Sequence, residues 1–303
     1  MKKMAFVFPG QGSQSVGMGK DLVETYPECA AIISETNRIL GYDLWQIMQE
    51  GSIEELSKTQ HAQAAIFSVS IMLFRLLKQK DIQACFYAGH SLGEITAYVA
   101  AGVLSFEEGL RLIQVRGRAM AEASPEGLAG MAAIMGASLE RIQSVLSQVD
   151  QVVVANFNCP GQIVISGLSS ELSKALLLFK EEGAKAIPLK VSGAFHSPFM
   201  KKASETLKQH CASLSFVDAD FPIVLNRNAS PEKNALALQA NLAEQVISPV
   251  RWIDTLEALD SQVDAIVEVG PGKVLSGLVK RTLPEKAIFN VSSTESLSLF
   301  LSY

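Results

Sequence analysis

A serine flanked by glycines, between a predicted strand and a predicted helix, is the feature that most constrains the fold. Residues 83–88 predict a short buried strand and residues 94–101 a helix, and between them stands Gly89-His90-Ser91-Leu92-Gly93, which fits the pattern G-x-S-x-G. In this context the serine occupies a strained turn, and the glycines prevent clashes with neighbouring backbone. The start of the helix also places free N–H groups beside the hydroxyl. Ser91 is therefore a candidate nucleophile; the alternative is an ordinary turn with a helix-capping serine.

Residues 127–196 predict a small domain inserted into a larger α/β domain. Their order is strand, helix, strand, strand, helix and strand, a βαββαβ pattern typical of ferredoxin-like units. The expected segments are Met131–Met135, Ser138–Val149, Val152–Asn156, Gln162–Ser166, Ser169–Glu182 and Ala186–Val191. Residues 1–126 and 197–303 then form the large domain, and a length of 303 residues fits two unequal domains.

The large domain alternates predicted strands and helices. We expect strands at Met4–Phe8, Ile223–Leu225 and Ala265–Val269, and helices at residues 62–80, 236–246 and Phe106–Ala123, the last capped by Ser105. The final stretch, Ser292–Tyr303, is rich in serine and leucine and carries little pattern. We expect it to be a loosely packed end.

Composition argues against several classes of function. The 26 basic and 31 acidic side chains give a net charge of −5 without a basic stripe, which argues against nucleic-acid binding. No apolar run reaches the ~18 residues of a membrane span. The four cysteines are far apart, so we expect no zinc ribbon and no disulfides, but a reduced, cytoplasmic setting. Gly10-Gln11-Gly12 lacks the third glycine of a dinucleotide-binding loop, because position 15 is serine.

A serine nucleophile needs a base, and the chain has four histidines. His196 is the strongest candidate, because it lies where the inserted domain rejoins the larger one and ligand sites favour such junctions. The alternative for His196 is a capping or core histidine. His90 is next to Ser91, and neighbours on a tight turn generally point apart, so we expect a supporting or leaving-group contact from it. His61 and His210 lie in polar helical surroundings and are expected at the surface.

The third member of a triad stays open. A carboxylate between the serine and the histidine would be usual, and Asp150 is the only aspartate there. Asp254, Asp264 and Glu268 follow the histidine without a distinctive local pattern. The residues alone therefore do not choose among these carboxylates.

Arg116 lies on the apolar face of a predicted helix. The residues three or four positions away share its side of that helix, and they are Leu112, Ile113, Ala119 and Met120. An unpaired guanidinium among apolar side chains is costly, so we expect an anionic partner. Either an internal carboxylate pairs with Arg116, or Arg116 binds the carboxylate of a substrate bidentately.

Seven motifs in order resemble those of the malonyl-CoA:acyl-carrier-protein transacylases. This family includes free-standing enzymes of fatty acid synthesis and trans-acting acyltransferases of polyketide assembly lines. The motifs are Phe8-Pro9-Gly10-Gln11-Gly12-Ser13-Gln14, Gly89–Gly93, Val115-Arg116-Gly117, Asn158 with residues 162–167, Gly193–Ser197, Gln245 with residues 248–252, and Glu268-Val269-Gly270-Pro271-Gly272. The resemblance covers nearly the whole chain and implies an α/β-hydrolase-like core with an inserted ferredoxin-like subdomain.

The resemblance also implies catalytic roles. Ser91 would be the acylated nucleophile and His196 its base, with the backbone N–H groups of Gln11 and Leu92 forming the oxyanion hole. Gln245 would occupy the open third place, because in this family a backbone carbonyl at that position orients the histidine.

The same resemblance implies substrate contacts. Arg116 would hold the malonyl carboxylate, and the bulk of Phe195 would leave less room for an α-methyl branch. Gln63 would line the acyl pocket, although Gln63-Ala64-Ala65 departs from the family's pattern, in which proline commonly follows the glutamine. His90 and Asn158 complete the expected substrate-binding set.

The implied reaction is ping-pong transfer of malonyl from malonyl-CoA to the phosphopantetheine thiol of an acyl carrier protein, without a metal or bound cofactor. Carrier proteins are acidic, so we expect a local basic patch, with candidates Lys190, Lys201, Lys202, Lys273, Lys280 and Arg281. We expect a monomer. The pathway, fatty acid or polyketide synthesis, stays open.

Three other functions are weighed against this one. Arg116 argues against a proofreading acyl hydrolase of the same fold, because a carboxylate clamp disfavours simple acyl groups. A carboxylesterase would show a triad acid and an HGGG-like loop, and neither is found. A non-catalytic scaffold that binds carrier proteins would not need Ser91, His196 and Arg116 together.

Overall fold

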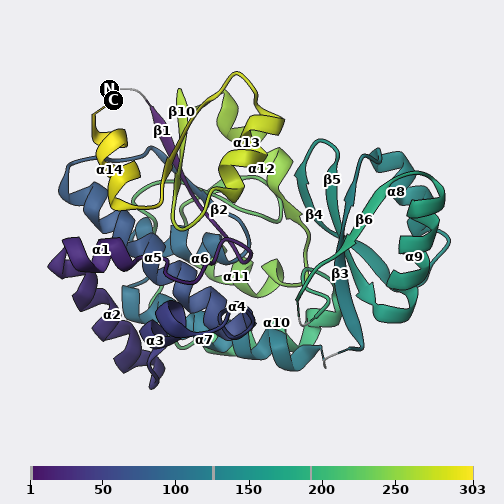
Figure 1. Cartoon of the computed structure of the whole chain (residues 1–303), viewed down its shortest axis with the longest axis horizontal. Helices are drawn as coiled ribbons and strands as arrows, with labels where there is room; N and C mark the ends of the chain where they lie inside the picture. Colours follow the sequence, from purple (N-terminus) through teal and green to yellow (C-terminus); the bar gives the residue numbers. More distant parts are fainter. Residues whose placement is uncertain (1–2, 125–126, 192, 303) are drawn as a thin grey trace.

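The large β-sheet has six strands in the order β11-β10-β1-β2-β7-β8 (Figure 1). The computed structural model describes residues 3–124, 127–191 and 193–302. The strands are β1 (Met4–Phe8), β2 (Phe86–Gly89), β7 (Ile223–Val224), β8 (Pro231–Glu232), β10 (Ala265–Val269) and β11 (Ala287–Val291). All neighbours pair in parallel except β7 and β8. The carboxyl ends of β1, β2 and β10 therefore meet at one edge, which brings together the turns that follow them.

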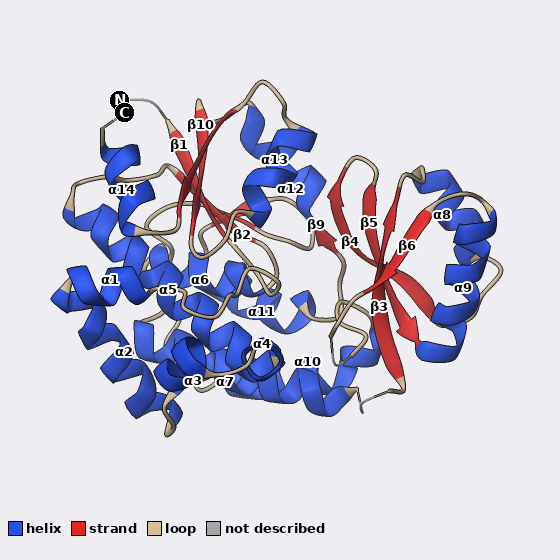
Figure 2. Cartoon of the chain, in the orientation of Figure 1, coloured by secondary structure: helices blue, strands red, loops and turns tan. Residues whose placement is uncertain are grey.

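A second sheet lies beside the first, on the right in Figure 2, with the order β6-β3-β5-β4-β9. Its strands are β3 (Ala129–Met135), β4 (Val152–Cys159), β5 (Gln162–Leu168), β6 (Lys185–Pro188) and β9 (Val250–Arg251), and α8 (Leu139–Leu146) and α9 (Ser169–Glu181) complete the unit. Strands β3 to β6 are antiparallel with the ferredoxin-like order, fourth, first, third, second. This confirms the expected fold class, an α/β body with a ferredoxin-like subdomain.

Strand β9 ties the two parts together. It comes from outside residues 127–196, yet it pairs in parallel with β4 through Asn156↔Val250 and Phe157↔Arg251. The sequence did not predict this strand. The predicted boundary after residue 126 falls beside residues 125–126, which lie outside the described part of the chain.

The remaining helices surround the large sheet. They are α1 (Lys20–Thr25), α2 (Pro27–Leu40), α3 (Leu44–Glu50), α4 (Ile53–Ser57), α5 (Thr59–Gln79), α6 (Leu92–Ala100), α7 (Phe106–Ala123), the short 3-10 helix η1 (Pro198–Met200), α10 (Lys201–Cys211), α11 (Ala235–Gln245), α12 (Trp252–Asp260), α13 (Val274–Thr282) and α14 (Thr294–Leu301). The helices expected at 62–80, 106–123 and 236–246 correspond to α5, α7 and α11. Among the described residues, none of the helices is long and apolar enough to cross a membrane.

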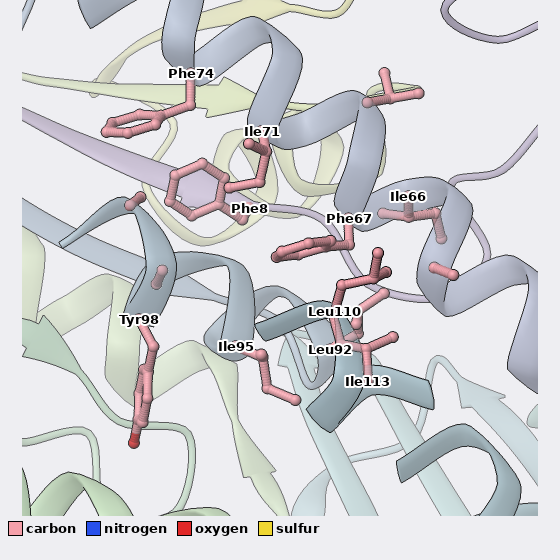
Figure 3. Packing of buried hydrophobic residues seen from close by; sticks show 14 of the residues in the cluster. Phe8, Ile66, Phe67, Ile71, Phe74, Leu92, Ile95, Tyr98, Leu110 and Ile113 are labelled. Atoms are coloured by element: carbon pink, nitrogen blue, oxygen red, sulfur yellow. The ribbon is translucent and has the colours of Figure 1, made fainter. Parts of the chain in front are cut away.

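The alternation of side chains along β1 explains why both faces of the large sheet are covered. Phe6 and Phe8 belong to one apolar cluster, with α5, α6 and α7, whereas Ala5 and Val7 belong to another, with α12 and α13. Figure 3 shows the first cluster around Phe8, with Phe67 reaching from α5 toward α6 and α7. This packing fixes α6 and α7 against the sheet edge where the turns meet.

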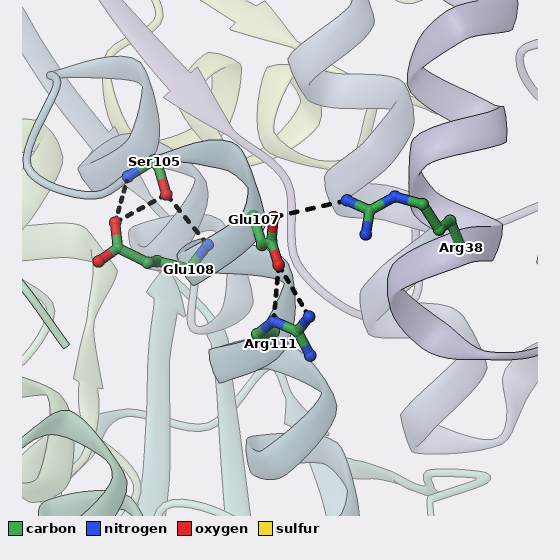
Figure 4. A network of polar contacts seen from close by, with 5 residues as sticks. All are labelled: Arg38, Ser105, Glu107, Glu108 and Arg111. Atoms are coloured by element: carbon green, nitrogen blue, oxygen red, sulfur yellow. Dashed lines mark hydrogen bonds and ion pairs between the residues drawn. The ribbon is translucent and has the colours of Figure 1, made fainter. Parts of the chain in front are cut away.

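The start of α7 is set by a capping box, as the sequence predicted for Ser105. The Ser105 hydroxyl accepts from the Glu108 N–H, and the Glu108 carboxylate accepts from the Ser105 N–H (Figure 4). On the exposed side, Glu107 accepts from Arg111 and Arg38. These contacts begin α7 at a defined residue, and Arg116 lies three turns further along.

The C-terminal expectation was wrong. Residues 294–301 form α14, which begins with a capping box between Ser293 and Ser296 and packs on β11. The backbone N–H of Thr294 also donates to the Asp21 carboxylate. The sequence signal was missed because the anchor is tertiary: β11 is the edge strand of the large sheet, and it holds the helix that follows. Tyr303 lies outside the described residues.

Candidate active site

Ser91 stands in a strained turn between β2 and α6. Its backbone angles are φ 53° and ψ −102°, a conformation that costs a non-glycine residue about 1–3 kcal/mol. A Cβ at Gly89 would lie 1.9 Å from the Gly93 carbonyl carbon, and a Cβ at Gly93 would lie 2.0 Å from the Phe8 carbonyl oxygen. Both glycines are therefore required by close backbone approach, as the G-x-S-x-G pattern predicted.

His196 lies directly against the Ser91 hydroxyl. Its Nε2 is 2.7 Å from Ser91 Oγ, and its Nδ1 is 3.1 Å from the carbonyl oxygens of both Gln245 and Ser248. Because carbonyl oxygens only accept, Nδ1 must carry the proton, and neutral Nε2 is left to accept from the serine. His196 also has a positive φ of 55°, so both members of this pair occupy strained backbone.

The third member of the triad, which the sequence left open, is a pair of backbone carbonyls and not a carboxylate. None of the four candidate carboxylates has a hydrogen bond to His196 among the described residues. Asp254 pairs with Arg251, Asp264 accepts from the Lys3 N–H, Glu268 accepts from the N–H groups of Leu275 and Ser276, and Asp150 is exposed. A neutral acceptor orients the imidazole but stabilises an imidazolium less than a carboxylate would.

Arg116 is buried, with 1% of its surface exposed, and its guanidinium also contacts the Ser91 hydroxyl. One terminal nitrogen donates to Ser91 Oγ at 2.9 Å and to Gln245 Oε1 at 3.0 Å, and the other donates to Gln63 Oε1 at 2.9 Å. Within the described chain it forms no ion pair, so the internal salt bridge expected as one alternative is absent. All of its acceptors are neutral, which leaves its charge available to an anion entering the site.

Burial changes the charge behaviour of both groups. Desolvation lowers the pKa of Arg116 to about 10, and the charge of Glu94 opposes this shift; Arg116 therefore stays a cation at neutral pH. Burial, followed by the charge of Arg116, lowers the pKa of His196 to about 3, although its carbonyl contacts act in the opposite direction. His196 is consequently a neutral acceptor over the ordinary pH range.

A cavity of about 350 Å³ opens above these groups. Nine of the ten residues that the sequence singled out line it, and these are Gln11, Gln63, His90, Ser91, Leu92, Arg116, Asn158, Phe195 and His196. Gln245 does not line the cavity, but its side chain bonds to two residues that do, Arg116 and Ser91. Residues from distant parts of the sequence thus converge on one space.

The cavity has two walls of different character. The helical wall consists of Gln63 on α5, Ser91 before α6 and Arg116 on α7. The sheet wall consists of Met131 on β3, Asn156 and Asn158 on β4, and Val164 on β5. The two walls are bridged by His90, whose Nε2 is 2.9 Å from Asn158 Oδ1.

Gln11 and Leu92 line the cavity together with Ser91. Gln11 follows β1 and Leu92 begins α6, and neither amide has a hydrogen-bond acceptor within the described chain. The loop that carries Gln11 is held close, since a Cβ at Gly10 would lie 2.4 Å from the His90 carbonyl oxygen. Such a pair of free amides is able to stabilise a developing oxyanion.

Several residues around the site escaped the sequence analysis. Glu94, Asn226 and Asn241 form buried hydrogen bonds beneath Ser91, and Ser248 supplies the second carbonyl to His196. Glu94 carried a sequence signal, because it is a carboxylate within the apolar first turns of α6, and Ser248 belonged to the motif that contains Gln245. Asn226 bonds to Ser91 and Glu94, and Asn241 bonds to Glu94, each more than 130 positions away in the sequence, so no local pattern reveals them.

One surface assignment was wrong. His61 is buried, with 7% of its surface exposed, because its ring packs against Tyr42 and its Nδ1 contacts the Glu55 carbonyl. It does not line the cavity around Ser91.

Comparison with known proteins identifies the family of this chain. Residues 5–299 match the family model described as "Acyl transferase domain". The malonyl CoA-acyl carrier protein transacylase of Bacillus subtilis is 43% identical over 305 residues, covering 99% of this chain and 96% of that protein. The chain belongs to the malonyl CoA-acyl carrier protein transacylase family. A transacylase of the same name from Escherichia coli is 42% identical and covers 93% of each chain.

Solved structures of transacylases have the same fold. A malonyl-transacylase in complex with its type II PKS acyl-carrier protein matches with a TM-score of 0.96 and 40% identity, covering 99% of each chain. The malonyl CoA-acyl carrier protein transacylase of Coxiella burnetii matches with a TM-score of 0.96 and 36% identity, covering 99% of this chain and 97% of that one. Family membership confirms the resemblance inferred from the seven motifs.

Proposed function

We propose that this chain is an acyltransferase that moves a malonyl group from malonyl-CoA to the phosphopantetheine thiol of an acyl carrier protein. One observation carries the proposal: a serine hydroxyl, a neutral imidazole and a buried guanidinium meet within 2.9 Å in one cavity. These are the nucleophile, the base and the carboxylate-binding cation that malonyl transfer requires. The names of the transacylase relatives support the same reaction.

In the first half-reaction, Ser91 Oγ attacks the thioester carbonyl of malonyl-CoA while His196 Nε2 takes the hydroxyl proton. The negative charge that develops on the carbonyl oxygen is stabilised by the N–H groups of Gln11 and Leu92. The C–S bond then breaks, His196 returns the proton to the leaving sulfur, and coenzyme A departs. The product is a malonyl ester of Ser91.

The second half-reaction reverses these roles. The phosphopantetheine thiol gives its proton to His196 and attacks the ester, the bond to Ser91 Oγ breaks, and the serine recovers its proton. The Gln245 and Ser248 carbonyls keep the imidazole oriented in both steps, because each accepts from Nδ1. Lys190 lies at the cavity and is exposed, which supports a place for it in a basic patch toward the acidic carrier.

The substrate contacts follow from the cavity lining. Arg116 would exchange its neutral acceptors for the malonyl carboxylate, a charge-assisted contact. Gln63 holds one guanidinium nitrogen and lines the acyl space. Phe195 is buried beside His196 and restricts an α-branch. Asn158 would hold the His90 ring through their hydrogen bond, and His90 would then contact the leaving group.

The test is loading of a carrier protein. The chain is incubated with malonyl-CoA and a phosphopantetheinylated carrier, and both proteins are analysed by intact mass. We expect a malonyl adduct on the enzyme, mapped to Ser91, and then a malonylated carrier. Free malonate without loaded carrier would identify a hydrolase instead, and an unmodified enzyme would point to a scaffold.

We also propose three broader features. A cytoplasmic location is supported by the four cysteines, all of which are free thiols. The chain is proposed to act as a monomer. Its division into residues 1–126 with 197–303 and residues 127–196 is supported by the separate second sheet, to which β9 adds one strand from the large part. Size-exclusion chromatography with light scattering tests the monomer.

A further inference from the structure

Glu94 is a buried carboxylate directly behind the nucleophile, and the proposed mechanism does not use it. It lies on the first turn of α6 and has no exposed surface. One oxygen accepts from the backbone N–H of Asn226 at 2.6 Å, and the other accepts from Asn241 Nδ2 at 2.6 Å. Both partners are neutral amides, so the carboxylate serves as a rigid double acceptor.

Asn226 transmits this contact to the backbone of the nucleophile turn. Its Oδ1 accepts from the Ser91 N–H at 2.7 Å, and its Nδ2 donates to the Gly89 carbonyl at 2.6 Å. The side chain therefore bridges the chain on both sides of His90. Gln245 adds a third bond, from its Nε2 to the Ser91 carbonyl at 2.8 Å.

This bracing acts where the backbone is strained. Ser91 has the unfavourable angles described above, and such conformations persist only where surrounding contacts determine them. The Asn226 amide belongs to the stretch after β7 and has no link in sequence to α6. Glu94 accepts from the backbone N–H of Asn226 at 2.6 Å and so holds the residue whose side chain braces Ser91.

Glu94 is also the carboxylate whose charge acts on buried Arg116. The two groups are both buried, on α6 and α7, without a direct ion pair. An isolated buried charge is costly, so opposite charges in one interior reduce the cost of both. Burial raises the pKa of Glu94 to about 7, and the hydrogen bonds from Asn226 and Asn241 and the charge of Arg116 oppose this rise, so these contacts favour its anionic form.

We propose that Glu94 is a positioning residue for acyl transfer, which holds Asn226 and, through Asn226, the backbone of Ser91 in the attacking geometry. Glu94 neither gives nor takes a proton in the reaction. The proposal rests on the proposed function only in taking Ser91 as the nucleophile. A misplacement of about 1 Å at a reacting atom reduces rates by roughly 100-fold, which sets the expected scale.

The central experiment compares Glu94→Ala with Glu94→Gln. Alanine removes both acceptors. Glutamine keeps one oxygen for the Asn226 N–H, and its amide would meet Asn241, whose Oδ1 has no partner in the described chain and is free to turn toward it. We expect Glu94→Ala to slow Ser91 acylation by about 10–100-fold with both malonyl-CoA and acetyl-CoA, with KM within about 3-fold. Glu94→Gln should recover to within about 5-fold of the parent.

Glu268→Gln is the matched control. Glu268 is equally buried and also accepts from backbone N–H groups, but at the start of α13 and away from Ser91. We expect its acylation rate, measured per folded molecule, to equal that of the parent. Equal losses in Glu94→Ala and Glu268→Gln that follow their melting temperatures would reduce Glu94 to a structural role and overturn the proposal.

Two further variants keep the test decisive if Glu94→Ala does not fold. Glu94→Asp keeps the charge but withdraws the carboxylate by one methylene, and we expect an intermediate loss. Asn226→Ala should lose rate as Glu94→Ala does, and combining it with Glu94→Asp should add little further loss, because both act through one contact. Full activity of Glu94→Asp, or full additivity of the pair, would contradict the proposal.

A second reagent separates this proposal from the proposed function. A fluorophosphonate modifies an activated serine whatever its natural acyl donor, so its rate of reaction with Ser91 reports the geometry alone. We expect the Glu94→Ala loss to appear with this reagent as well. If the parent reacts with the fluorophosphonate but not with malonyl-CoA, the proposed function fails while Glu94 is still tested.

Discussion

The two walls of the cavity are built in different ways. On the helical wall, Gln63, Ser91 and Arg116 are joined by hydrogen bonds of 2.9 Å and are backed by further buried amides. On the sheet wall, Met131 and Val164 present apolar surface, and Asn158 makes the contact to His90. The comparison suggests that the helical wall performs the chemistry, whereas the sheet wall shapes the space for the acyl group.

The largest effect is expected on the helical wall, at the nucleophile. Ser91→Ala should lower malonyl transfer by about 10⁴-fold or more, because no other group replaces the hydroxyl. Transfer is followed by the appearance of loaded carrier on intact-mass spectra. Ser173→Ala, an exposed serine on α9, is the control and should be unchanged. An unchanged rate in Ser91→Ala would remove the catalytic assignment.

The next largest effect is expected at Arg116, where malonyl-CoA and acetyl-CoA together distinguish a role of its charge from a purely structural role. Arg116→Ala should lower kcat/KM for malonyl-CoA by roughly 100- to 1,000-fold, the scale of one lost charge-assisted contact, while acetyl-CoA gains relative to malonyl-CoA. Arg118→Ala is the control, since Arg118 lies two residues further on and pairs with Glu122 in solvent. Equal losses with both acyl-CoAs would make Arg116 a structural residue.

The pH dependence of acylation tests the coupling between Arg116 and His196. Burial first and Arg116 second lower the pKa of His196, whose neutral form is the base; the parent therefore keeps its base as the pH falls toward about 3. Removing the cation in Arg116→Ala raises that pKa, so the acid limb of the acetyl-CoA profile should move upward by on the order of one pH unit. His90 also opposes protonation, so His90→Ala should shift the limb in the same direction. An acid limb that does not move in Arg116→Ala would show that the two groups are uncoupled.

A smaller effect is expected where the walls meet. Asn158→Ala leaves half-buried His90 without its Nε2 partner, a loss worth up to about 1–3 kcal/mol, the cost for a fully buried polar group. Only part of this should reach the transition state, so we expect acylation to slow by about 5–10-fold. Asn156→Ala, on the same strand and without the His90 contact, should lose less. Equal rates in the two variants would mean that the bridge has no function.

The smallest effect is expected from the sheet wall itself. Met131→Ala enlarges the cavity without touching the reacting groups, so malonyl transfer should fall by only about 2–3-fold. The ratio of methylmalonyl-CoA to malonyl-CoA activity should rise, since an α-branch gains room. A loss as large as that of Arg116→Ala would place part of the chemistry on the sheet wall and end the distinction between the walls.

Much of the fold was predictable because its signals are local. The βαββαβ order followed from short apolar runs, and α7 begins at Phe106 after its N-cap Ser105, as the capping pattern indicated. Strand β9 and helix α14 were missed, since the two-residue strand is stabilised by pairing with β4, and the serine-rich helix by packing on β11 and by the contact of its first residue with Asp21.

The candidate site was predictable to the same degree. Ser91 was found from glycine spacing, and Arg116 from a charge on an apolar stripe. The pairing of His196 with two carbonyls was not, because the bottom-up search looked for a carboxylate, and only the family resemblance pointed to Gln245. Asn226 had no signal of either kind, and Ser248 stood in the sixth motif of the resemblance without a role assigned to it.

The sequence by itself determined which residues carry reactive groups and that Ser91 occupies a strained turn, because the backbone clash that requires glycine at position 89 acts within five residues. The tertiary structure decided what surrounds that turn. Hydrogen bonds from Asn226 and Gln245 cross more than 130 residues of chain, and their directionality requires the packed sheet and helices to bring each donor within 3 Å. Only folding therefore turns a reactive serine into an oriented nucleophile with a neutral base and a buried cation beside it.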